Sequence, residues 1–77
     1  MLTGEILQAL SDSEINWSIS QFYDEGTCFV LGDRLNGYKS VQYIDDIERG
    51  VEFLAKEAAA EYPKSEFTKK WNERTTP

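Results

Sequence analysis

The chain has 77 residues, of which 40% are hydrophobic and 29% charged, and its formal net charge is −6. This length allows one small domain, and the composition is that of a folded chain. The sequence contains no histidine, the commonest general base, and no stretch near the ~20 apolar residues of a membrane span. Because the N-terminus also lacks a basic region followed by an apolar run, we expect a cytoplasmic protein.

The first third of the chain predicts a short helix and two strands. Residues 3–11 place Ile6, Leu7 and Leu10 on one side of a helix that Thr3 would cap. Residues 15–20 alternate apolar and polar side chains, as a half-buried antiparallel strand does. After a turn at residues 23–26, TCFVLGD is apolar on both faces and predicts a central strand. Its single cysteine cannot form an internal disulfide and is predicted to be a small core residue; a reactive thiol is the alternative.

Residues 32–40, GDRLNGYKS, are close to a phosphate-binding loop. Such a loop needs the lysine directly after the second glycine and a helix to follow, whereas here Tyr38 intervenes and the next residues favour a strand. Asn36-Gly37 instead predicts a two-residue type I′ hairpin, because both residue types tolerate positive φ. This turn leads into a third strand over residues 38–43.

Residues 44–62 are the strongest helical segment. Asp45 would cap the helix, with Glu48 completing a capping box. Its apolar stripe, predicted to lie across the sheet, is Ile47, Val51, Leu54, Ala58 and Tyr62. Gly50 inside the helix costs about 1 kcal/mol relative to alanine, so we expect a close approach of helix to sheet there.

Pro63 ends this helix, and Ser65 would cap a final short helix whose Phe67 and Trp71 close the core. The predicted fold class is therefore α+β, with the order α-β-β-β-α plus a short C-terminal α. Residues 1–74 form a single small domain in which helices pack on one face of a three-stranded antiparallel β-meander. Residues 75–77 are predicted to be a frayed tail.

The sequence offers little for catalysis. Asp45, Asp46 and Glu48 could hold a hard cation, but their spacing matches no known loop and helix capping explains them. We therefore expect a non-enzymatic protein with no catalytic residues, no cofactor and no metal site.

Charge is the more informative property. Residues 1–62 carry twelve acidic and four basic side chains, whereas residues 63–77 carry two acidic and four basic ones. These acidic side chains either keep the protein soluble or form a patch that binds a protein partner with a basic surface. The candidate partner-binding residues are Asp24, Glu25, Asp33, Asn36, Tyr38, Asp45, Asp46, Glu48 and Glu52.

The element order and the alanine-rich segment EFLAKEAAAEY resemble the double-stranded RNA-binding domain. That family places lysines at the start of its last helix to meet phosphates, where this chain has Ile44-Asp45-Asp46-Ile47-Glu48. None of the family's motif residues is matched, so no function is carried over. Direct nucleic-acid binding through the main body is disfavoured, because carboxylates would face phosphates.

Two functional hypotheses from different classes follow. In the first, the protein is an acidic inhibitor or nucleic-acid mimic that occupies the groove of a basic nucleic-acid enzyme, as anti-CRISPR and other mobile-element proteins do. In the second, it is an ordinary interaction module or a homodimeric subunit. The homodimer would be joined through a sheet edge or through exposed aromatic residues among Phe22, Tyr23, Tyr38 and Tyr43.

Overall fold

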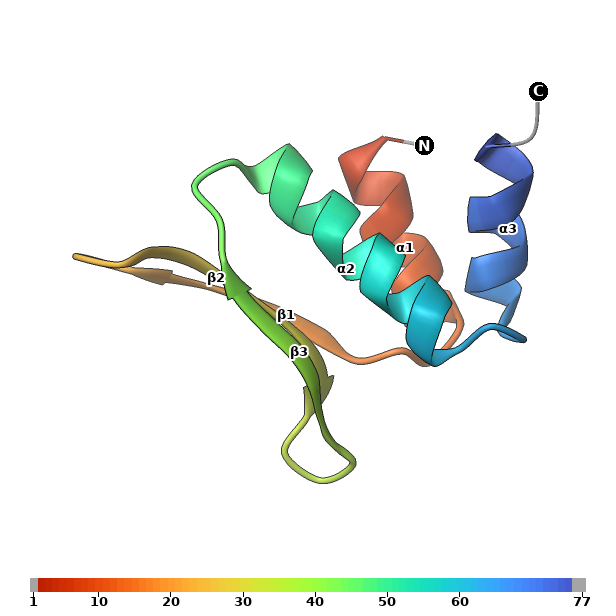
Figure 1. Cartoon of the computed structure of the whole chain (residues 1–77), viewed down its shortest axis with the longest axis horizontal. Coiled ribbons are helices and arrows are strands. Elements are labelled where there is room, and N and C mark those ends of the chain that lie inside the picture. The colour runs from red at the N-terminus through yellow and green to blue at the C-terminus, as the bar shows by residue number, and fades with distance from the viewer. Residues whose placement is uncertain (1, 76–77) are drawn as a thin grey trace.

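A computed structural model describes residues 2–75 of the chain (Figure 1). Its elements are α1 (Thr3–Asp12), β1 (Trp17–Phe22), β2 (Gly26–Asp33), β3 (Gly37–Tyr43), α2 (Ile47–Glu61) and α3 (Glu66–Thr75). The strands form one antiparallel sheet in the order β1-β2-β3, and the helices lie together on one side of it. The predicted α+β class, element order and meander are confirmed. Of the tail predicted to fray, Thr75 is the last residue of α3, and residues 76–77 lie outside the described part.

Both hairpins close through three-residue loops that end at a glycine. Tyr23–Glu25 lead to Gly26 at φ +86°, and Arg34–Asn36 lead to Gly37 at φ +92°. The predicted hairpin between β2 and β3 is confirmed, but the predicted type I′ turn at Asn36-Gly37 is wrong. A type I′ turn needs positive φ at both central residues, and here only Gly37 has it.

The caps differ from the predicted ones by a single residue at two helices. Leu2, not Thr3, is the N-cap of α1. Asp46, not Asp45, is the N-cap of α2, and its carboxylate accepts hydrogen bonds from the N–H groups of Glu48 (2.8 Å) and Arg49 (3.3 Å). The predicted cap of α3 is confirmed, since the Ser65 hydroxyl accepts a hydrogen bond from the N–H of Thr68 at 3.1 Å.

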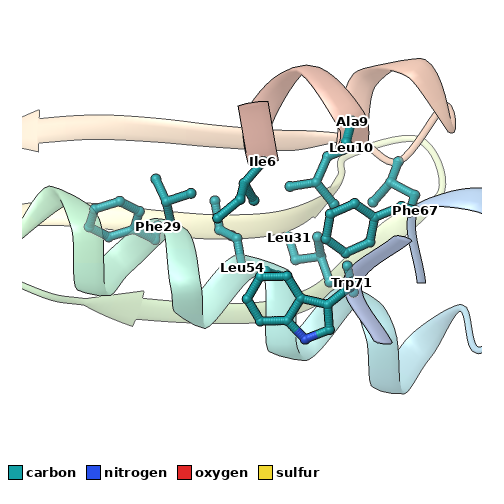
Figure 2. Packing of buried hydrophobic residues seen from close by; sticks show 12 residues of the cluster. Ile6, Ala9, Leu10, Phe29, Leu31, Leu54, Phe67 and Trp71 are labelled. Carbon is teal, nitrogen blue, oxygen red and sulfur yellow. The ribbon is translucent and has the colours of Figure 1, made fainter. Parts of the chain in front are cut away.

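The core lies between the sheet and the helices (Figure 2). Phe29 and Leu31 of β2 are fully buried against the stripe of α2, in which Val51, Leu54 and Ala58 are also fully buried. Ile47, at the start of the predicted stripe, is instead about half exposed. The other core side chains are Ile6, Ala9 and Leu10 of α1, Ile15, Ala55 of α2, and Phe67 and Trp71 of α3.

Helix α3 closes one end of this core, as predicted. Phe67 is fully buried, and Trp71 is 6% exposed beneath the guanidinium of Arg74, whose carbon lies 3.4 Å from the ring centroid. The N–H of Phe67 donates to the Ser13 hydroxyl at 2.9 Å, which ties the start of α3 to the end of α1. The helical layer is thus cross-linked by polar as well as apolar contacts.

Candidate protein-binding surface

Helix α2 packs on one face of the sheet, with α1 and α3 packed against α2, and no helix of residues 2–75 covers the other face (Figure 1). Side chains alternate between faces along a strand, so the buried Phe29 and Leu31 put Cys28 and Val30 on the uncovered face. The register then adds their cross-strand partners. Ser18 and Val41 pair with Val30, while Ser20 and Tyr43 pair with Cys28. None of these six side chains is charged.

Aromatic rings cover part of this face. Phe22 of β1 and Tyr43 of β3 meet across β2, with ring centroids 6.0 Å apart and an interplanar angle of 53°. Between these strands Cys28 is only 6% exposed, although no helix covers it. Phe22, Val41 and Tyr43 remain 44%, 55% and 48% exposed. We define these three residues with Val30 and Cys28 as the sheet-face patch.

Cys28 is therefore shielded by side chains of the sheet itself. The prediction of a small buried cysteine is confirmed, but the residue packs on the uncovered side and not in the main core. The Cys28 thiol, followed by burial and the Glu25 carboxylate, raises the pKa of the Tyr43 phenol above its ordinary value. Tyr43 is therefore neutral at physiological pH and adds no charge to the patch.

Acidic side chains border the patch at one end. Asp24 and Glu25 lie in the β1–β2 loop, which projects beyond the helical layer at the left of Figure 1. Asp45 approaches the same loop, because a Cβ placed on Gly26 would lie 2.9 Å from its Oδ1 atom. Glu25 also interacts with Tyr43. Asp24, Glu25 and Asp45 are here called the acidic end, and its Glu25 adjoins the Tyr43 ring.

The other loop residues predicted to bind a partner lie at the opposite end of β2. Asp33 accepts hydrogen bonds from the N–H of Asn36 (2.6 Å), from the Asn36 amide nitrogen (3.1 Å) and from the side chain of Asn16. These bonds, led by the backbone N–H of Asn36, hold the pKa of Asp33 below its ordinary value. Asp33 and Asn36 therefore fix the loop, while Tyr38 is 62% exposed beside it.

The candidate residues of α2 have separate surroundings. Asp46 caps the helix, and Glu52 forms an ion pair with Lys56 at 3.1 Å. Glu48 and Glu52 line a crevice between the helices that Trp71 and Arg74 also border. The structure thus places Asp45 beside the loop that carries Asp24 and Glu25 and leaves the remaining candidates elsewhere.

The sheet-face patch as a whole is not among the predictions made from the sequence. Phe22 and Tyr43 are predicted above only as contacts of a homodimer, and Val30 and Val41 are not predicted as surface residues. One signal was available: Cys28 and Val30 alternate with Phe29 and Leu31, so a sheet covered on one face must leave one of these pairs uncovered.

Within residues 2–75, no helix is long and apolar enough to cross a membrane, and no group of three or more Cys, Asp or Glu side chains is placed to hold a metal ion. Comparison of the chain with protein-family models, with curated proteins and with solved structures finds no significant match.

Proposed function

We propose that this is a non-enzymatic protein-binding module that docks onto a partner protein through the sheet-face patch. The observation that carries the proposal is the exposure of Phe22, Val41 and Tyr43 on an uncharged sheet face that no helix of the described chain covers. In a chain with 29% charged residues, an uncharged face with exposed rings is typical of a docking surface.

The acidic end defines the chemistry of the partner. A protein docked on Phe22 and Tyr43 would extend over Glu25 and Asp45, so its surface should be apolar at the centre and basic at that border. In the narrower form of this proposal, the partner is a basic enzyme, and this protein inhibits it by occupying its nucleic-acid groove. This form requires that nucleic acid and this protein compete for the same partner.

The test is affinity capture with variants that differ only in where a charge is added. Val41→Lys places an ammonium group in the patch at a half-exposed position, so the fold should tolerate it. Leu35→Lys makes the same kind of change at the tip of the β2–β3 loop, where the side chain is 94% exposed. We expect wild type and Leu35→Lys to retain the same partner and Val41→Lys to lose it. Equal retention by both variants would contradict the proposal.

Salt tests the docking through the sheet-face patch, and added nucleic acid tests the inhibitor form of the proposal. Apolar docking should survive 0.5 M salt with a moderate loss of affinity, since salt screens the acidic border but not the apolar contacts. Asp24→Asn with Glu25→Gln should weaken binding at low salt only. Release of the partner by added nucleic acid would support the inhibitor form, and binding of both together would exclude it.

A further inference from the structure

Strand β3 lies at an edge of the sheet, and its hydrogen-bonding pattern shows which backbone groups are left outward. The N–H of Ile44 donates to the carbonyl of Thr27 at 2.9 Å. Because hydrogen-bonded pairs alternate along an antiparallel ladder, Gln42 with Phe29 and Ser40 with Leu31 are the next such pairs. The N–H and C=O groups of Val41 and Tyr43 therefore point away from β2, along the free edge.

Helix α2 borders a groove next to this edge. The buried side of α2 packs on β2 and β3, while Arg49 and Phe53 line an open groove of about 640 Å³ together with Gln42 of β3 and the neighbouring Ile44. Phe53 is only partly buried there. Because Gln42 belongs to the edge strand, the groove adjoins the free edge.

We infer that a second copy of the chain fills this groove by pairing its own β3 with this one, antiparallel about a twofold axis at Gln42. The backbone groups of Gln42 point toward β2 and are not available at the free edge. An axis at Gln42 therefore places the Gln42 residues of the two copies opposite each other as a non-hydrogen-bonded pair. Val41 then lies opposite Tyr43 of the second copy and exchanges backbone hydrogen bonds with it. The two sheets become one continuous sheet.

The helical layer fits the same axis. Because α2 contacts both β2 and β3, it lies about one strand spacing from the twofold axis. The two α2 helices would then be about 10 Å apart, which is the distance at which helices pack. The helix and strand run alongside each other in opposite directions in Figure 1, and the Ser40 hydroxyl donates to Glu57 at 2.7 Å. Gln42 therefore lies below Phe53. A twofold axis there brings the Phe53 rings of the two copies together.

Charge explains why the occupant is a second copy and not an unrelated peptide. Arg49 and Glu57 are equally spaced on either side of Phe53, so the axis places Arg49 opposite Glu57 of the second copy. The charges of the helical layer are thus self-complementary about the same axis that pairs the strands. The inference does not rest on the proposed function, which uses the face of the sheet and not its edge.

Sedimentation equilibrium combined with amide hydrogen exchange tests this pairing. At concentrations up to about 1 mM, which reveal even a millimolar dissociation constant, we expect a dimer. Its formation should protect the amides of Val41 and Tyr43, whereas those of Ser40 and Gln42 are protected at every concentration by β2. A monomer throughout this range, or a dimer in which Val41 and Tyr43 exchange freely, would overturn the inference.

Charge reversal at Arg49 and Glu57 of α2, neither of which belongs to the hydrophobic core, gives a second test. Arg49→Glu puts two carboxylates opposite each other at each end of the helix contact and should weaken the dimer about tenfold. Adding Glu57→Arg in the same chain restores opposite charges and should recover most of the loss. Lys70→Glu, on α3 outside the groove, is the matched control. No weakening by Arg49→Glu, or weakening that Glu57→Arg does not relieve, would contradict the proposed axis.

Discussion

The ring of Phe29 in β2 lies directly against Gly50 in α2. A Cβ atom built on Gly50 would lie 2.0 Å from the Cζ atom of Phe29 and 2.2 Å from each of its two Cε atoms. Both residues are buried, so the ring has no free space to move into. The glycine therefore sets how closely α2 approaches the sheet, and the close approach predicted from the sequence at this position is confirmed.

We expect Gly50→Ala to destabilise the protein. Alanine improves helix propensity by about 1 kcal/mol, but its methyl group would overlap the Phe29 ring, and overpacking of a core costs about 1–3 kcal/mol or more. The free energy of unfolding, measured by urea denaturation, should fall by about 1–2 kcal/mol.

Two further variants isolate the steric cause. Gly4→Ala in α1, where nothing lies within 4 Å of the added Cβ, should be neutral or stabilising by up to about 1 kcal/mol. Phe29→Leu should relieve part of the loss when combined with Gly50→Ala. If the two losses simply added, the overlap with the ring would not be their cause.

The glycines of the β2–β3 hairpin should differ in tolerance. Gly37 has positive φ but open space around it, so Gly37→Ala should cost only the backbone strain, about 1–2 kcal/mol. Gly32 has φ +101°, and a Cβ there would lie 2.4 Å from the Gly37 carbonyl oxygen. Gly32→Ala should therefore lower the melting temperature more than Gly37→Ala, and the reverse order would contradict this hairpin geometry.

The two neighbouring aspartates before α2 should be unequal. Asp46→Ala removes the side chain that accepts bonds from Glu48 and Arg49, which should cost about 1 kcal/mol in a chemical denaturation experiment. Asp45→Ala should change stability much less, and Asp46→Asn should retain most of the cap. Equal effects at both positions would favour the cap first predicted from the sequence.

Asp33 should make the hairpin sensitive to acid. Hydrogen bonds from Asn36 and Asn16 lower its pKa in the folded chain below the roughly 3.9 of an unfolded aspartate. The stability that it contributes is thus present above about pH 4 and is lost as the pH falls through the folded pKa. Carboxyl resonances followed by NMR should give Asp33 a low midpoint, and Asn36→Ala should raise it. A midpoint at the ordinary value in wild type would contradict these bonds.

Much of the fold follows from local pattern. Alternation places the strands, and the stripe of α2 identifies the side that meets the sheet. The errors arise where neighbours compete for one role: Asp45 and Asp46 are both good caps, and a short Asn-Gly sequence serves several loop lengths. These choices depend on the exact path of the chain, which a single segment does not determine.

The binding surface was harder to predict. Charge drew attention to carboxylates, but Asp33 and Asp46 turn out to bind backbone N–H groups of their own chain. That successive turns of a meander lie at opposite ends of the middle strand was available from the predicted topology, and it separates Asp24 from Asp33. Which face of β2 stays uncovered depends on helix packing, so the sheet-face patch became visible only in three dimensions.

Labelling of Cys28 is the most direct test of docking through this patch. The thiol lies beneath the exposed rings, so a small maleimide should react slowly in wild type and faster in Phe22→Ala, which removes part of the shield. With the captured partner bound to Phe22→Ala, we expect the labelling rate to fall well below that of the free variant. An unchanged rate in a saturated complex would show that the partner binds elsewhere and would contradict the proposed docking surface.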